Sequence, residues 1–142
     1  GEAGWEAAPS SLNEPATYST VAGTNSGASM NSNGYRNTAF GYDSLRYHVD
    51  SDDNTAFGYK ALFGVSGSVT SSAHENVAIG SEALQDLTGG EMNVAVGKSA
   101  AHNLTTGESN VLVGTGAASS LTTGLKNIGI GNNTLGGVTT QN

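Results

Sequence analysis

A short unit recurs six times along the chain, and this repeat constrains the fold more than any other feature of the sequence. The copies begin at Asn37, Asn54, Asn76, Asn93, Asn110 and Asn127, so they are 17 residues apart except for one step of 22. Their opening residues read NTAFGYDSL, NTAFGYKAL, NVAIGSEAL, NVAVGKSAA, NVLVGTGAA and NIGIGNNTL. Self-similarity at a fixed short period is typical of solenoids and related repeat architectures.

The repeat also sets the domain organisation. A degenerate copy, STVAG, begins at Ser19, so we assign residues 19–142 to one repeat domain and residues 1–18 to an N-terminal extension or linker. The 22-residue unit has five extra residues between Phe63 and Glu75. This stretch is rich in Gly, Ser, Val and Thr, which indicates a loop that leaves one coil.

The length and composition of the unit predict an all-β fold. A unit of 17 residues is too short for two packed helices, and the Gly at the fifth position of every copy would break a helix. We therefore predict a β-solenoid, or β-roll, in which each unit forms one coil and neighbouring coils lie about 4.8 Å apart. The spacing of Leu84 and Leu87 later in the unit fits either a helical turn or an irregular second strand.

The alternation within each strand predicts which side chains form the core. In residues 93–97 the second and fourth residues are β-branched and share one face, whereas Asn, Ala and Gly occupy the other face. We expect the β-branched face to be the interior, together with the later leucines. The predicted interior residues include Val77, Ile79, Leu84, Leu87, Val94, Val96, Val111, Val113, Ile128 and Ile130.

Stacking of like units places like residues above one another in columns. The six Asn residues named above are expected to form a ladder of side-chain amide hydrogen bonds. The Gly column is expected to supply a positive φ, or room for close backbone approach, where the strand turns a corner. This column contains Gly41, Gly58, Gly80, Gly97, Gly114 and Gly131. A second polar column contains Thr88, Thr105, Thr122 and Thr139.

The composition disfavours several functional classes. Five Lys and Arg against 12 Asp and Glu give a net charge of −7, which disfavours nucleic acids and anionic membrane surfaces as partners. No apolar run approaches the ~20 residues of a membrane-spanning helix, so we expect no membrane insertion. The chain has no Cys and no G-x-S-x-G motif. We therefore predict that the protein is not an enzyme and has no cofactor.

A calcium-loop pattern begins at Asp50 but is incomplete. Asp50, Asp52 and Asn54 match D-x-D-x-N, which places oxygen ligands at alternating positions. Thr55 and Ala61 then stand where the loop requires Gly and a bidentate Glu. We predict a solvated turn and no metal site here. His48, His74 and His102 occupy different positions in their units, so we expect separate surface histidines rather than a zinc site.

Aromatic residues gather in the first two full units. They are Tyr35, Tyr42, Tyr47, Tyr59 and Phe63, and they form either a ligand patch or additional packing in the core or at an end of the assembly. The paired threonines raise ice binding as another possibility. Thr105 and Thr106 would point to opposite faces of an extended segment, which leaves one Thr column where ice binding needs two.

The NVAIG segment and its sister copies resemble two related groups of trimeric extracellular fibres. These are the head repeats of trimeric autotransporter adhesins of the YadA type and the N-T-A-[IV]-G-Y-x-A-L repeats of phage tail fibres. The tail-fibre repeats are closer, because NTAFGY at Asn37 and at Asn54 matches them nearly residue for residue. The resemblance covers about residues 19–142 and implies a parallel homotrimer of narrow β-rolls at a virion or cell surface.

The resemblance implies a structural and attachment segment that binds a surface glycan or a protein receptor. The small number of apolar side chains expected inside each coil also favours association with other chains. Two alternatives stay open. One is a subunit of a self-assembling surface filament, and the other is a monomeric β-solenoid that binds ice or carbohydrate. The oligomeric state in solution distinguishes the three.

Overall fold

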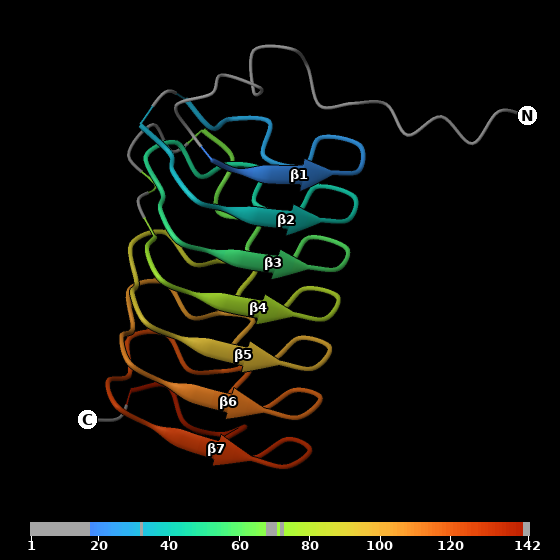
Figure 1. The fold of residues 1–142 in the computed structure, drawn as a ribbon. Coiled ribbons are helices and arrows are strands. Elements are labelled where there is room, and N and C mark those ends of the chain that lie inside the picture. The colour runs from blue at the N-terminus through green and yellow to red at the C-terminus, as the bar shows by residue number, and fades with distance from the viewer. Residues whose placement is uncertain (1–17, 32, 68–70, 72, 141–142) are drawn as a thin grey trace, which may run out of the picture.

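The chain folds into an all-β parallel solenoid with one coil per repeat unit. The computed structural model describes residues 18–31, 33–67, 71 and 73–140, so the predicted extension lies outside the described residues except for Tyr18. Seven short strands stack in sequence order, as Figure 1 shows. They are β1 (Thr20–Ala22), β2 (Thr38–Phe40), β3 (Thr55–Phe57), β4 (Val77–Ile79), β5 (Val94–Val96), β6 (Val111–Val113) and β7 (Ile128–Ile130).

The strand register follows the repeat. All neighbouring strands are parallel, and residues at equal positions of the unit face each other, as in Val77 opposite Val94. The degenerate copy at Ser19 forms the first of these strands, because Thr20 pairs with Thr38. Ser19 stands where the later units have Asn, and its hydroxyl accepts a hydrogen bond of 3.0 Å from the backbone N–H of Asn37.

Each coil turns its corners at residues with left-handed backbone conformation. Gly80 has φ of +129°, and a Cβ at this residue would lie 2.6 Å from the carbonyl oxygen of Gly97 in the next coil. Both a positive φ and close backbone approach therefore require Gly at the fifth position. The other corners use ordinary residues, such as Glu82, Leu84 and Met92 in the coil that begins at Asn76. The segment around Leu84 forms a run of turns, neither a helix nor a strand.

The interior of the coils is narrow and contains small residues, leucines and asparagines. Within each strand the middle residue points inward, and this residue is Ala in β2 to β5 and Leu112 in β6. Leu84, Leu87 and Leu104 are fully buried, as expected. The Asn side chains of the full repeats from Asn37 to Asn110 are also buried.

The predicted strand orientation is wrong. The β-branched residues at the second and fourth positions, such as Val94 and Val96, are partly exposed, whereas Ala95 between them is fully buried. The same holds for Val77, Ile79, Val111, Val113, Ile128 and Ile130. The coil is too narrow for two columns of β-branched side chains as well as the Asn ladder, so the small face turns inward.

The extra residues of the long unit lie between Gly64 and Ser71. The backbone N–H of Gly64 still pairs with the next coil at Gln85, and the hydroxyl of Ser71 donates to the carbonyl of Thr88. In the next coil the positions that correspond to Gly64 and Ser71 are Asp86 and Thr88, and a single residue, Leu87, separates them. Six residues, 65–70, therefore replace one leucine position, and the strands on either side keep their register.

Candidate functional site

The outward side of the sheet presents a mostly apolar row of side chains along the stack. It consists of the first and third residues of each three-residue strand, which are the second and fourth residues of the repeat unit, and it is called the apolar face here. From β2 to β7 it contains Thr38, Phe40, Thr55, Phe57, Val77, Ile79, Val94, Val96, Val111, Val113, Ile128 and Ile130. None of these residues is charged. Phe57 and Ile79 are 41% and 40% exposed, so their side chains stay accessible in the single chain.

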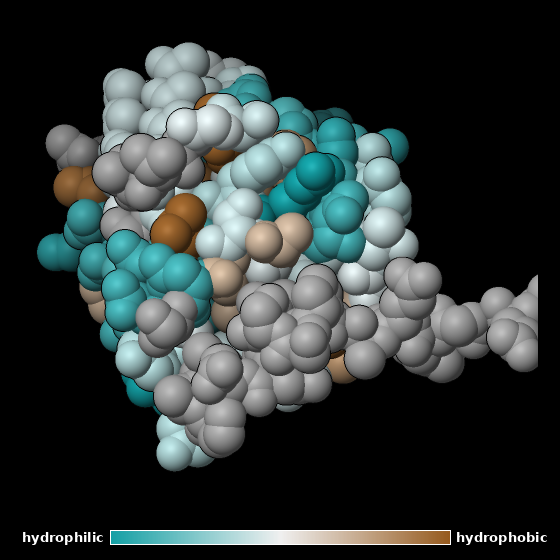
Figure 2. All heavy atoms as spheres, turned by 90° about the horizontal axis from the view of Figure 1, so that it is seen from above, coloured by the Kyte–Doolittle hydropathy of each residue, from teal (hydrophilic) through white to brown (hydrophobic). Residues whose placement is uncertain are grey.

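The apolar face is regular along the whole stack. The rings of Phe40 and Phe57 stack on each other with centroids 4.9 Å apart. From β4 onward, Val and Ile fill both outward columns at the same coil spacing. Figure 2 looks down the stack from the β1 end, where hydrophilic residues predominate and hydrophobic atoms are scattered. The apolar face lies along the side of the stack, on the outward side of β2 to β7.

The Asn side chains form a continuous hydrogen-bonded ladder inside the solenoid. In each step the side-chain oxygen of one Asn accepts from the backbone N–H and from the side-chain amide of the next Asn. For Asn93 and Asn110 these distances are 3.1 and 2.9 Å. The amide of Asn93 also donates to the carbonyl of Gly107 at 2.8 Å. The ladder runs through all six residues, from Asn37 to Asn127.

The Thr column is used within the stack. Thr88, Thr105 and Thr122 each donate their hydroxyl to the backbone carbonyl of the Thr in the next coil, at 2.9 to 3.2 Å. Thr106 and Thr123, the second residues of their pairs, are exposed. Among the described Thr pairs, the hydroxyls of the first column are therefore used within the stack, and the second residues remain at the surface.

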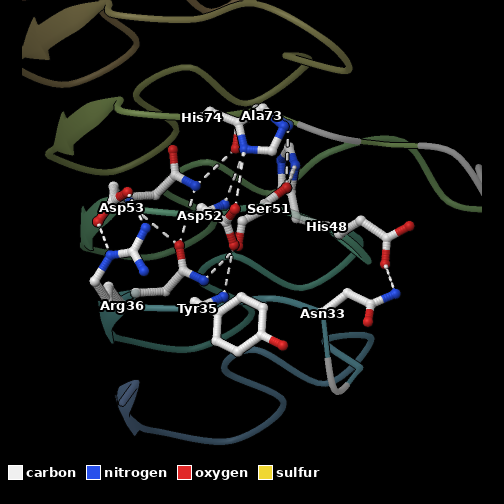
Figure 3. Close-up of polar contacts among 12 residues, drawn as sticks. Asn33, Tyr35, Arg36, His48, Ser51, Asp52, Asp53, Ala73 and His74 are labelled. Carbon is white, nitrogen blue, oxygen red and sulfur yellow. Dashed lines mark hydrogen bonds and ion pairs between the residues drawn. The ribbon is translucent and has the colours of Figure 1, made fainter. Parts of the chain in front are cut away.

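The residues of the calcium-loop pattern do not share one centre. Figure 3 shows this polar corner of the stack. Asp50 accepts from the side-chain amide of Asn31 at 2.7 Å, and Asp52 accepts from the backbone N–H of Tyr35 at 2.7 Å. Asn54 belongs to the buried ladder. Among the described residues, no cluster of three His, Asp or Glu side chains has the arrangement of a metal site.

His48 is buried, which corrects the prediction of a surface histidine. It occupies the position of Leu87, Leu104 and Leu121 in the later coils and is fully buried. Its Nδ1 lies 3.3 Å from the hydroxyl of Ser51 and 3.1 Å from that of Ser71, as Figure 3 shows in part. Burial, and to a smaller extent the nearby His74, lowers the pKa of His48 from 6.5 to about 4.

Sequence reasoning missed this Ser and His cluster, because the two serines come from different coils. The signal that could have found it is the break in the leucine column, where His48 and the extra residues replace two consecutive leucines. Both serines are buried with the imidazole. A substrate would therefore have no access to it, and the cluster fills the space that leucines fill elsewhere.

Four of the five predicted aromatic residues form one continuous surface, called the aromatic patch here. It consists of Tyr42, Tyr47, Tyr59, Lys60 and Phe63. The rings of Tyr42 and Tyr59 stack with centroids 5.8 Å apart, and Tyr47 and Phe63 meet edge to face at 5.0 Å. The ammonium group of Lys60 joins the two pairs, at 5.4 Å from the Tyr59 ring and 4.9 Å from the Phe63 ring.

Tyr35 lies apart from the aromatic patch. Its backbone N–H donates to Asp52 at the polar corner, and among the described residues its ring contacts none of the four other aromatic residues. The predicted ligand patch is therefore smaller than the sequence suggested. It is confined to the coils that begin at Asn37 and Asn54.

Comparisons with known proteins identify no family for this chain. No protein-family model, no curated protein and no solved structure matches the chain. Within the described ranges, no helix is long and apolar enough to cross a membrane. The resemblance to fibre repeats is therefore a sequence prediction that has to be weighed against the geometry alone.

Proposed function

We propose that the chain is a segment of a trimeric extracellular fibre that attaches to a host or substrate surface. Three parallel copies would pack their apolar faces against one another around a common axis. The observation that carries this proposal is the apolar face itself, which holds no charged residue from β2 to β7 although the chain has a net charge of −7. Exposed apolar surfaces of this extent are typical of protein interfaces.

The occupant of the apolar face is a further copy of this chain. Each copy presents two columns of side chains at the same coil spacing, so columns from parallel copies interdigitate without loss of register along the stack. The narrow interior supports this, since Ala fills the inward strand position in β2 to β5 and leaves Val, Ile and Phe outside. The number three comes from the resemblance to tail-fibre and adhesin repeats, which also supports a location at a virion or cell surface.

Sedimentation of the whole chain and of two aspartate variants tests the proposal. The wild-type chain should sediment as a trimer at micromolar concentration. Val96→Asp places a charge on the apolar face and should yield a folded monomer, because an unpaired charge would be buried in the trimer. Thr106→Asp adds the same charge at an exposed residue outside the apolar face and should remain trimeric.

The same measurement separates the alternatives. A wild-type chain that is folded and monomeric at micromolar concentration would contradict the trimer and leave the monomeric solenoid that binds carbohydrate. The single exposed Thr column gives ice binding no support. Mass that keeps growing with concentration would instead favour the self-assembling filament.

A further inference from the structure

We propose that the aromatic patch binds a neutral carbohydrate, with Tyr42 and Tyr59 as the stacking platform and Lys60 as a hydrogen-bond donor. This inference rests on the proposed attachment function and names the ligand class. It assigns a role to side chains that the stack itself does not require.

The aromatic patch is local, whereas the features that build the stack are not. Its sixth-position residues, Tyr42 and Tyr59, are followed in the later coils by Ser81, Lys98, Thr115 and Asn132. The apolar face and the Asn ladder continue through all of these coils. An interface between copies would use features that recur in every coil. A feature confined to two coils suits a ligand of limited size.

The tyrosine rings are accessible. Tyr42 is 50% exposed and Tyr59 is 45% exposed, although Tyr side chains readily bury in cores and interfaces. The stack ends at small residues, because the next coil on either side has Thr24 and Ser81 at the sixth position. One ring face at each end of the pair therefore adjoins a small side chain, which leaves room for a flat ligand to stack. Sugar rings present C–H faces that suit such platforms.

Lys60 is oriented toward the rings and not toward a carboxylate. Glu82 is at the same position of the next coil, and its backbone N–H donates to the carbonyl of Tyr59 at 2.8 Å. Within the described residues, the ion pairs of Arg side chains join Arg36 to Asp53 and Arg46 to Asp43, two His side chains lie near Asp52 and Asp86, and Lys60 forms no ion pair. Its ammonium lies over two aromatic rings instead, where it has hydrogen-bonding capacity left for a hydroxyl group.

The surrounding charges favour a neutral sugar over an acidic one. Arg46, the other cation near the patch, lies over the Tyr47 ring, but Asp43 neutralises it at 2.8 Å. The adjacent coil contributes two carboxylates, Glu82 at the unit position of Lys60 and Asp86, and both would repel a carboxylate or sulfate group that bound nearby. A neutral saccharide avoids this repulsion, and the ammonium group of Lys60 can still donate a hydrogen bond to one of its hydroxyl groups.

Titration of the full chain with four oligosaccharides tests the site. The probes are maltotetraose, cellotetraose and chitotetraose, with oligogalacturonate as the acidic comparison, and the readout is the aromatic NMR signals. At least one neutral probe should shift the signals of Tyr42 and Tyr59. Tyr59→Ala should weaken that binding at least about tenfold, and Lys60→Gln should weaken it to a smaller extent. The matched control is Tyr18→Ala, which removes a tyrosine that is 80% exposed and lies outside the patch.

The outcomes distinguish this inference from the fibre proposal. Failure of all three neutral probes, binding of oligogalacturonate alone, or equal loss in Tyr18→Ala would each overturn the carbohydrate site. A wild-type chain that sediments as a trimer and binds none of the probes would leave the fibre proposal standing. A folded monomer that binds a neutral probe through Tyr59 would overturn the trimer and leave the site.

Discussion

The coils that begin at Asn37 and Asn54 differ from those that begin at Asn76 and later, although all follow the same backbone path. The first two coils contain the aromatic patch, the buried His48 and the five extra residues of the long unit. The later coils have Leu87, Leu104, Leu121 and then Val138 in the apolar column, and polar or small residues at the sixth position. The Asn ladder and the strand register pass through both regions without interruption.

This comparison separates what the solenoid requires from what it tolerates. The ladder Asn and the corner Gly are present in every full coil, and the inward strand residue is small in all of them except β6, where it is Leu112. The leucine column, in contrast, is interrupted twice in succession, and the stack continues. The ladder and the strand hydrogen bonds therefore define the coil, while the remaining interior and the outer turns are free to acquire other features.

The largest effect should come from breaking the ladder, and it should be equal in both regions. Asn54→Leu and Asn93→Leu each remove amide hydrogen bonds to the neighbouring Asn residues and leave buried partners unsatisfied. Each should lower the free energy of unfolding by at least about 3 kcal/mol. Denaturant unfolding at one fixed chain concentration measures the loss.

Asn103→Leu is the matched control, because Asn103 is exposed and lies outside the ladder. Its effect should be small. A loss at Asn54 far below that at Asn93 would mean that the ladder is weaker in the irregular region. The claim that both regions share one structural basis would then be wrong.

An intermediate effect should follow from acidification, and it should depend on His48. Since the pKa of His48 is about 4 in the folded chain and 6.5 when solvated, the unfolded chain binds the proton first as pH falls. The stabilising contribution of the neutral, buried His48 is present above pH 6.5 and is lost progressively down to about pH 4. Over this range the free energy of unfolding should fall by roughly 3 kcal/mol. His48→Leu should remove this part of the pH dependence, as measured by unfolding across that range.

The reverse substitution, from leucine to histidine, applies the same test to the regular region. Leu104→His places an imidazole in the leucine column, where no pair of serine hydroxyls is present to form hydrogen bonds with the ring. It should destabilise the chain at neutral pH and introduce a new loss on acidification. If wild type and His48→Leu lost equal stability between pH 6.5 and 4, the carboxylates alone would account for the acid sensitivity.

Much of the fold could be predicted from the repeat, because equal spacing of Asn and Gly requires equal backbone paths. The period specified the coil, and the degenerate copy at Ser19 formed β1 as its sequence suggested. The orientation of the strands could not be obtained from alternation alone. Apolar residues on one face indicate burial, but they do not distinguish the interior of one chain from an interface between chains.

The corners show a second limit. Glycine marks one corner of each coil, but Glu82, Leu84 and Met92 adopt positive φ without any sequence signal. The backbone N–H of each of these residues donates to a carbonyl of a neighbouring coil, so tertiary context overrides their intrinsic preference. Likewise, the grouping of Tyr42 with Tyr59 followed from the period, whereas the link through Lys60 depends on side-chain directions that the sequence does not specify.

The smallest effect on stability should come from removing the surface ion pair at one corner of the irregular region. Arg36 binds Asp53 in the next coil at 2.6 Å, and each partner shifts the pKa of the other away from neutrality. Both side chains are exposed, where ion pairs contribute little. The regular region has Met92 and Ser109 at this corner, with the same positive φ and no charge pair. Arg36→Gln should therefore leave the melting temperature unchanged at physiological salt, and Ser109→Gln, its uncharged counterpart in the regular region, should do the same. A clear drop for Arg36→Gln alone would show that the irregular coils depend on surface charges for a corner that the regular coils form without them.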